Sequence, residues 1–126
     1  MSIPNNLKYT KEHEWVLIEG NIGTIGVTDY AQGELGDVVF VDIDPAISAI
    51  KKGDSIGTIE AVKTVSDIFA PFTGKVIELN ESLKDNPEVV NSDPYGQGWM
   101  LKVEISDVSE LSDLLDSTSY QALIGQ

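Results

Sequence analysis

The chain has 126 residues, of which 41% are hydrophobic, and this size and composition predict a single folded domain over residues 1–126. Its 21 acidic residues outweigh 8 lysines, arginine and cysteine are absent, and the formal net charge is -13. This charge argues against binding to nucleic acid or to an anionic membrane and favours a soluble monomer. Solubility alone explains the charge, or it also steers the chain toward basic patches on its partners. The lack of cysteine excludes disulfides and thiol catalysis.

The start of the chain and its scarce metal ligands restrict the function further. Residues 1–7 have neither the basic stretch nor the apolar core of a signal or transit peptide, so we expect a cytoplasmic protein. No apolar run approaches the roughly 20 residues that a membrane-spanning helix requires. One histidine without cysteine offers no credible zinc or haem site, and no Asp-x-Asp-x-Asp-Gly loop indicates calcium.

The first regular pattern predicts a hairpin. Residues 13–19 and 22–27 alternate apolar and polar side chains, and Gly20-Asn21 between them is a turn signal. His13 and Glu14, at its start, are the residue types of acid–base catalysis. A lone histidine in an amphipathic strand is more often structural, and we favour that interpretation.

A short helix and a strand follow. Thr28-Asp29 predicts a cap for a helix over residues 30–35, which Gly36 ends. Residues 37–43 predict a strand, and its wholly apolar face is expected to pack inward. That face consists of Val39, Val41 and Ile43.

A second hairpin places a lysine at its tip. Residues 55–61 and the return run from Val65 to Ile68 are two short β-branched runs that meet at a polar turn, and Lys63 lies in that turn. A lysine at a hairpin tip holds its amine in water, open to an enzyme active site. A carboxylic cofactor joined to that amine would lie at the end of a long flexible arm that begins with the lysine side chain. The alternative is an ordinary solvated lysine.

The rest of the chain predicts more strands and a helical end. Residues 75–79 and 99–105 predict strands, and residues 111–123 have helical spacing. Asn86-Pro87 suits the start of a short helix with the proline at its first position. The expected caps of this tail are Ser109 and Asp116 or Ser117. Short strands separated by glycine and proline turns predict a mainly β fold, a small antiparallel sandwich or flattened barrel with short helices and a helical C-terminus.

Four segments in order resemble one known family. They are residues 9–16, residues 26–41, Glu60-Ala61-Val62-Lys63 with Ser66-Asp67, and residues 91–100. Over roughly residues 5–124 the chain resembles the H-proteins of the glycine cleavage system, which belong to the lipoyl and biotinyl carrier superfamily. The resemblance implies the barrel-sandwich hybrid fold of that superfamily.

Other functions remain open. Biotin carriers usually flank the modified lysine with methionines, whereas Val62 and Thr64 flank Lys63 here, which makes a biotin carrier less favoured. A lipoate-relay protein of H-protein type would share the fold and Lys63, and the sequence separates it poorly. A hydrolytic enzyme that uses His13, or an interaction module without cofactor, would belong to different classes.

The resemblance implies a carrier that is not itself an enzyme. Lipoate would be attached as an amide to Lys63 and would carry the aminomethyl group of glycine. The implied partners are a pyridoxal-phosphate glycine decarboxylase, a tetrahydrofolate-dependent aminomethyltransferase, dihydrolipoyl dehydrogenase and the lipoylating enzymes. Tethering would give the arm a high local concentration at each partner.

The resemblance also implies a surface cleft that holds the loaded arm. Its cationic amine favours carboxylates beside an apolar wall, and Glu14 and Asp67 lie in the matching motifs. The expected wall consists of Val27, Ala31 and Leu35. Glu60 is expected to serve recognition by the lipoylating enzyme, or to fix the hairpin.

Overall fold

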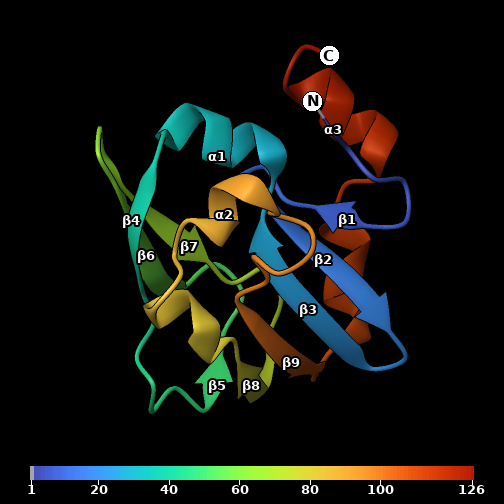
Figure 1. Ribbon diagram of the computed structural model, residues 1–126. Helices are drawn as coiled ribbons and strands as arrows, with labels where there is room; N and C mark the ends of the chain where they lie inside the picture. The colour runs from blue at the N-terminus through green and yellow to red at the C-terminus, as the bar shows by residue number, and fades with distance from the viewer. Residues whose placement is uncertain (1) are drawn as a thin grey trace.

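The computed structural model describes residues 2–126, and within them two antiparallel sheets form a sandwich (Figure 1). The strands are β1 (Lys8–Tyr9), β2 (Glu14–Glu19), β3 (Ile22–Val27), β4 (Val38–Asp42), β5 (Ala49–Ile50), β6 (Ser55–Ala61), β7 (Val65–Phe69), β8 (Gly74–Leu79) and β9 (Leu101–Ile105). The larger sheet has the order β1-β2-β3-β9-β8-β5, and the smaller sheet has the order β4-β6-β7. The predicted barrel-sandwich hybrid is therefore confirmed.

Short helices connect the strands and end the chain. They are α1 (Asp29–Leu35), α2 (Val89–Ser92) and α3 (Ser117–Leu123), with 3-10 turns η1 (Glu81–Lys84) and η2 (Val108–Asp113). The predicted helical C-terminus is confirmed. Among residues 2–126, no helix is both long enough and apolar enough to cross a bilayer.

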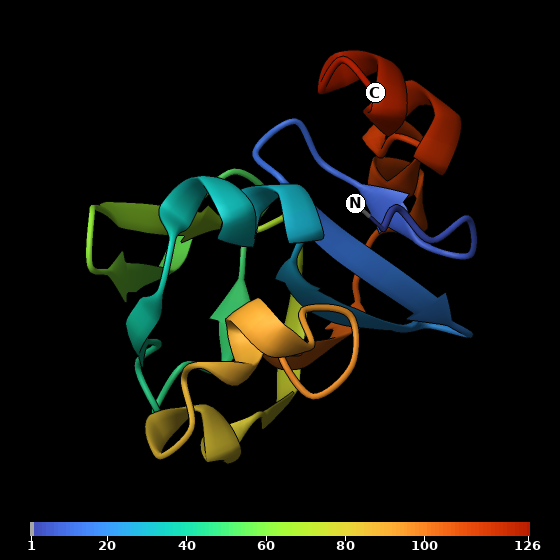
Figure 2. The same ribbon diagram turned by 45° about the horizontal axis from the view of Figure 1, so that its top comes forward.

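One apolar core joins the two sheets, and a smaller core ties the chain ends together. Buried side chains of β2, β3 and β9 meet those of β4, β6 and β7 in the main core. The smaller core surrounds Tyr9 of β1 and Tyr120 of α3, whose rings stack with centroids 4.7 Å apart. Figure 2 shows the resulting contact of the C-terminal helix with the N-terminal strand. The end of the chain is thus fixed beside its beginning.

The α1 helix forms where its capping residues predict it. Thr28 is the N-cap, and its Oγ1 accepts a hydrogen bond from the backbone N–H of Ala31 at 3.2 Å. Gly36 ends the helix with a φ of 81°, a left-handed conformation that glycine adopts without strain. The helix lies across the end of the sandwich where the β6–β7 turn also lies (Figures 1 and 2).

The predicted inward face of β4 is wrong at Val39. The pairing of β4 with β6 is irregular between Val38 and Phe40, so the strand contains a bulge there. A bulge inserts an extra residue and shifts the alternation of faces. Val38 is consequently buried, whereas Val39 is exposed, and Val41 faces the core as predicted.

Two details of the later chain also differ from prediction. The α2 helix has Glu88 as its N-cap, so Pro87 lies before the helix and not at its first position. Asp107, not Ser109, caps η2 by accepting a hydrogen bond from the Ser109 backbone at 3.0 Å. Asp107 occupies the N-cap position, whereas Ser109 lies inside the turn and donates its N–H to that cap. Asp116 caps α3 as predicted.

Candidate functional site

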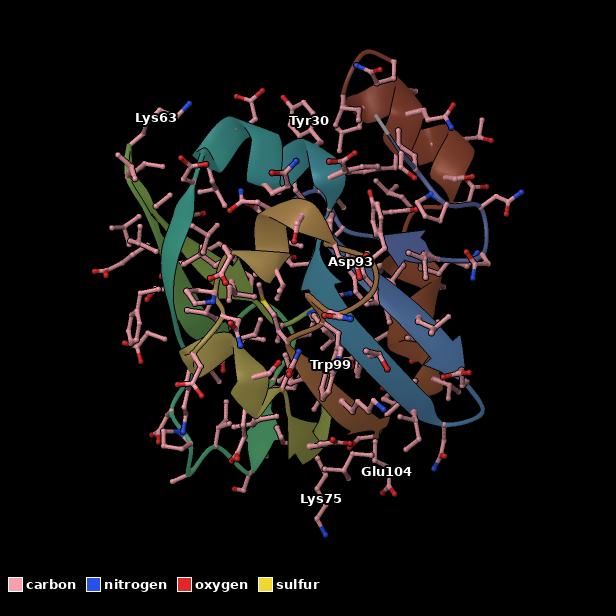
Figure 3. The ribbon with its side chains drawn as sticks, viewed as in Figure 1. Tyr30, Lys63, Lys75, Asp93, Trp99 and Glu104 are labelled. Carbon is pink, nitrogen blue, oxygen red and sulfur yellow. The ribbon has the colours of Figure 1, made fainter. Side chains whose placement is uncertain are left out.

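The β6–β7 hairpin presents Lys63 to solvent. The turn is closed by the Ala61 N–H, which donates to the Thr64 carbonyl at 2.8 Å, and is anchored to the start of β4 by a 3.0 Å bond from the Val62 N–H to the Asp37 carbonyl. Figure 3 shows Lys63 at the extremity of the molecule. Within residues 2–126 no ion pair involves its amine. The amine is therefore free to react or to be acylated.

The stem of Lys63 leans toward the end of α1. A Cβ atom added to Gly36 would lie 2.8 Å from Cε of Lys63, so the lysine stem passes directly over this glycine. The positive φ of Gly36 and this close approach both favour glycine. An arm built on Lys63 therefore begins beside α1.

A cleft of about 240 Å³ opens between α1, the β2–β3 strands and the hairpin. It is lined by Glu12, His13, Glu14, Val27, Tyr30, Ala31, Glu34, Leu35, Ile59, Ser66 and Asp67. All five residues that the sequence assigned to an arm-holding cleft line this one space, although their role remains a prediction. The sequence reasoning missed the other lining residues. Tyr30 and Glu34 could have been found, because they share the helical face of Ala31 and Leu35.

Glu14 forms the buried acidic part of the cleft and is only 2% exposed. Its Oε1 accepts a hydrogen bond from the Thr10 hydroxyl at 2.5 Å, and its Oε2 accepts one from the Phe69 N–H at 3.2 Å. Burial raises the pKa of this carboxyl to about 7, against the two hydrogen bonds that lower it. The two bonded donors are neutral, so a cation that enters the cleft would meet a carboxylate without a charged partner.

Asp67 occupies the rim of the cleft. Along β7, Ser66 pairs with the buried Ile59 of β6, whereas Asp67 pairs with Thr58. Because side chains alternate across a strand, Ser66 faces the cleft side, and Asp67 faces the other side of the hairpin. Its Oδ1 accepts a hydrogen bond from the Ser55 hydroxyl at 3.2 Å. The two predicted carboxylates therefore have different surroundings.

A hydrogen-bond network behind the cleft joins three distant segments. The hydroxyl of Tyr120 lies 2.8 Å from Nδ1 of His13 and 2.7 Å from Oγ1 of Thr28, the N-cap of α1. His13 has a φ of 71°, and its ring lies 4.9 Å from that of Tyr30. Burial lowers the pKa of His13. The α3 helix thus contacts both the loop and the helix that border the cleft.

This network favours a structural role for His13. One ring nitrogen is engaged with a buried phenol, and the Thr28 hydroxyl that completes the network also caps α1. A nucleophile–base pair needs a hydroxyl or thiol free to attack. The geometry supports the structural interpretation over the hydrolytic one.

A second hollow of about 540 Å³ shares Glu12 and Glu14 with the cleft. It reaches the end of β7 that is farthest from Lys63, at Phe69. Its Lys52 is paired with Asp113. Among residues 2–126, no group of three or more His, Cys, Asp or Glu side chains is arranged to hold a metal ion. The smaller cleft, beside Lys63, is the better candidate site despite its size.

Known proteins match this chain over its whole length. A sequence profile described as "Glycine cleavage H-protein" matches residues 7–126. The chain is 56% identical to a "Glycine cleavage system H protein" of Staphylococcus haemolyticus (strain JCSC1435) over 126 residues, which is 100% of both chains. The fold matches a crystal structure of a glycine cleavage system H protein from Mycobacterium marinum with a TM-score of 0.89 and 35% identity, covering 98% of this chain and 100% of that one. The chain therefore belongs to the glycine cleavage H-protein family.

Proposed function

We propose that this chain is the lipoyl carrier of a glycine cleavage system, with lipoate attached to Lys63. The observation that carries the proposal is an exposed lysine on the same hairpin that borders a cleft containing a buried carboxylate. The residues fit the group, because the Lys63 amine has no ion-pair partner within residues 2–126 and its stem passes over Gly36 at the end of α1, the helix that borders the cleft. When bound, lipoate supplies a disulfide ring that accepts the aminomethyl group of glycine.

The length of the arm is comparable with the span of β7 beside the cleft. From Cα to the ring sulfur, a lipoylated lysine spans about 14 bonds, or roughly 15 Å when extended. Ser66 lies three residues beyond Lys63, which is roughly 10 Å of extended strand. Phe69, whose N–H donates to Glu14, lies six residues beyond Lys63, an upper limit of roughly 20 Å. The loaded arm continues about two bonds beyond the sulfur, so when folded back it extends past Ser66 and its amine approaches Glu14.

Each part of the cleft has a role in this proposal. Glu14 pairs with the cationic amine of the loaded arm, in surroundings that exclude most of the water. Asp67 lines the edge of the cleft, but its side chain faces the other side of the hairpin, so it adds only a solvated negative charge nearby. The apolar wall of Val27, Ala31 and Leu35 contacts the hydrocarbon part of the arm. Excluding water at the amine slows hydrolysis while the carrier moves between enzymes.

The proposed partners are those of the glycine cleavage system. The glycine decarboxylase loads the arm, the aminomethyltransferase takes the methylene unit for tetrahydrofolate, and dihydrolipoyl dehydrogenase reoxidises the dithiol. The carrier needs no catalytic side chain, because each partner provides its own. A net charge of -13 would steer it toward basic surfaces on these enzymes.

A lipoate relay is the second candidate, and the cleft argues against it. Passing lipoate to other carriers requires Lys63, but it does not require a buried carboxylate that can pair with an amine. The Glu14 carboxylate is buried and accepts hydrogen bonds from Thr10 and Phe69, and a cationic cargo would explain why a carboxylate is kept there. Transfer of lipoate from the loaded chain to a second carrier, in the absence of glycine, would favour the relay.

Intact mass tests the attachment site. The chain expressed with lipoylating enzymes should gain the mass of one lipoyl group, and Lys63→Arg should gain none, because a guanidinium does not give up its proton to become a nucleophile. Lys75→Arg is the matched control, since Lys75 is an exposed lysine at the opposite end of the molecule (Figure 3). Lipoate on another lysine, or glycine cleavage by Lys63→Arg, would refute the proposal.

A further inference from the structure

Residues 36–38, which join the end of α1 to the start of β4, support the tip of the lysine-bearing hairpin. We call these three residues the support segment. The stem of Lys63 passes over Gly36, and the Val62 N–H donates to the Asp37 carbonyl at 3.0 Å. The position of the lysine therefore depends on the position of the support segment.

Asn91 of α2 binds the support segment on both sides of Asp37. Its side-chain Oδ1 accepts a hydrogen bond from the Val38 N–H at 2.8 Å, and its Nδ2 donates to the Gly36 carbonyl at 2.9 Å. A third bond runs from Nδ2 to Oε1 of Gln32 in α1, at 3.0 Å. The side-chain amide thus uses its acceptor and both of its donors, a combination that only asparagine and glutamine side chains offer.

A buried neighbour fixes Asn91 in place. Val90, the preceding residue of α2, is fully buried in the main core, and the Asn91 N–H donates to the Glu88 carbonyl at 3.0 Å. The α2 helix lies next to α1 (Figures 1 and 2). Asn91 therefore connects the support segment, and with it the hairpin tip, to the core of the domain.

The direction in which the arm leaves the tip decides which face of the hairpin it covers. Ile59 and Ser66 pair across β6 and β7 and line the cleft. Glu60 and Val65 are the next pair, and alternation turns them to the opposite face. A long arm attached at the tip can lie on either face, so its first bonds must run toward α1 for the arm to enter the cleft.

We propose that Asn91 is a positioning residue for the lipoyl arm, an inference that rests on the proposed function. By holding the support segment, Asn91 fixes the base of the arm beside α1 and on the cleft side of the hairpin. A tethered group occupies a nearby site in proportion to its local concentration there. A displaced base lowers this concentration, so the loaded arm spends more time in water and is hydrolysed sooner.

Two matched substitutions isolate this role. Asn91→Asp keeps the acceptor oxygen but loses both N–H donors. Asn80→Asp is the control, because the Asn80 side chain forms the same set of bonds elsewhere. It accepts from the Ser82 N–H and donates to the Gln97 and Trp99 carbonyls. Both changes add one negative charge and remove two donated bonds, but only the first affects the support segment. Asn91→Ser and Asn80→Ser repeat the comparison without added charge, and thermal unfolding midpoints verify that each variant is folded.

Hydrogen exchange of the Val62 amide, followed by NMR, measures the hairpin tip without any cofactor. We expect about tenfold faster exchange in Asn91→Asp than in Asn80→Asp, because the loss of two hydrogen bonds makes local opening of the support segment easier. Equal exchange of the Val62 amide in the two variants would overturn the inference.

A spin label measures the direction of the arm. The chain has no cysteine, so Lys63→Cys can carry a single thiol-linked nitroxide. Ala31 and Leu35 line the cleft, and their amides should be relaxed by the label. We expect this relaxation to fall about twofold when Asn91→Asp is added, because the local concentration of the label at the cleft falls, and to stay unchanged with Asn80→Asp. Equal relaxation in the two would likewise contradict the positioning role.

The lifetime of the loaded arm tests the consequence for the carrier. With excess lipoylating enzyme, we expect Asn91→Asp to accept lipoate on Lys63 completely. Once loaded, it should lose the aminomethyl group about threefold faster than Asn80→Asp. Equal lifetimes would overturn the inference even if the tip moves. Failure of the unaltered chain to accept lipoate on Lys63 would instead refute the proposed function, and the exchange and spin-label measurements would still report on Asn91.

Discussion

The tip of the hairpin and the floor of the cleft hold a charged side chain in opposite ways. Lys63 is exposed on a turn closed by one backbone hydrogen bond, and no ion pair within residues 2–126 involves it. Glu14 is 2% exposed and is held by side-chain and backbone donors from Thr10 and Phe69. The tip of the hairpin leaves the Lys63 amine accessible, whereas the floor of the cleft removes the Glu14 carboxylate from water.

In the proposed function, this difference divides the work of the carrier between the two sites. An attachment lysine must be reached by several enzymes, so exposure and position matter more than a fixed geometry. Protection of a cargo requires a fixed, partly dry environment, which raises the pKa of Glu14 to about 7. Substitutions at the floor should therefore change how long the cargo survives, and not whether the arm is attached.

The largest expected effect belongs to Glu14→Gln. Glutamine keeps the size of the side chain but removes the negative charge, so the amine loses a charge-assisted contact of about 2 kcal/mol. We expect the loaded arm to hydrolyse about thirtyfold faster, while lipoylation of Lys63 is unchanged. Release of ammonia and formaldehyde from the isolated, loaded protein measures this rate. Equal lifetimes for the variant and the unaltered chain would remove Glu14 from the site.

The same carboxyl should make stability depend on pH. Its pKa is raised from 4.5 to about 7 in the folded chain, so between these values the unfolded chain releases a proton that the folded chain keeps. Stability is therefore lost as pH rises through this window, by roughly 3 kcal/mol, and is constant above it. Glu14→Gln should not show this loss, so its unfolding free energy relative to the unaltered chain should rise between pH 4.5 and pH 8.

Denaturant unfolding of both proteins at several pH values measures this difference. Glu12, His13, Glu34 and Asp67 also line the cleft. They are present in both proteins, so subtracting the two profiles isolates the contribution of Glu14. Parallel profiles would show that Glu14 titrates normally.

Local signals in the sequence predicted the parts of the site that depend on local structure. Thr28 and Gly36 predicted the bounds of α1 to within one residue, because caps act on adjacent backbone groups. The hairpin around Lys63 formed where two β-branched runs meet. The assignment of Val27 to the cleft came from the family resemblance, and the structure places it in the same space as Glu14.

The parts that were missed depend on residues far apart in the chain. The Phe69 N–H that holds Glu14 is 55 residues away, and the Tyr120 hydroxyl that meets His13 is 107 residues away. The bulge at Val39 is likewise set by the pairing of β4 with β6, and not by the alternation within β4. No periodicity within one strand or helix carries such information.

Tyr120→Phe should have an intermediate effect. It keeps the ring that stacks on Tyr9 but removes the hydroxyl between His13 and Thr28, a loss of about 1 kcal/mol that loosens the cleft border. We expect the loaded arm to hydrolyse about fivefold faster. The chain has one histidine, so its single imidazole NMR signal should also shift in this variant.

Tyr9→Phe is the matched control for Tyr120→Phe. Tyr9 belongs to the same small core, and its hydroxyl donates to the Pro4 carbonyl instead of a cleft residue. It should lose a similar amount of stability without changing the lifetime of the arm or the signal of His13. Equal lifetimes in the two variants would mean that Tyr120 acts on stability alone.

The smallest expected effect belongs to Asp67→Asn. Asp67 is exposed at the rim, and its Oδ1 accepts a hydrogen bond from Ser55 that the amide oxygen of asparagine can also accept. A solvated carboxylate contributes under about 1 kcal/mol to an ion pair, so the arm lifetime should fall no more than about twofold, and raised salt should remove even this difference. The measurement is the hydrolysis rate of the loaded protein at low and high salt, beside Glu14→Gln. A loss as large as that of Glu14→Gln would mean that the cargo amine pairs at the rim, because only a desolvated contact gives so large an effect.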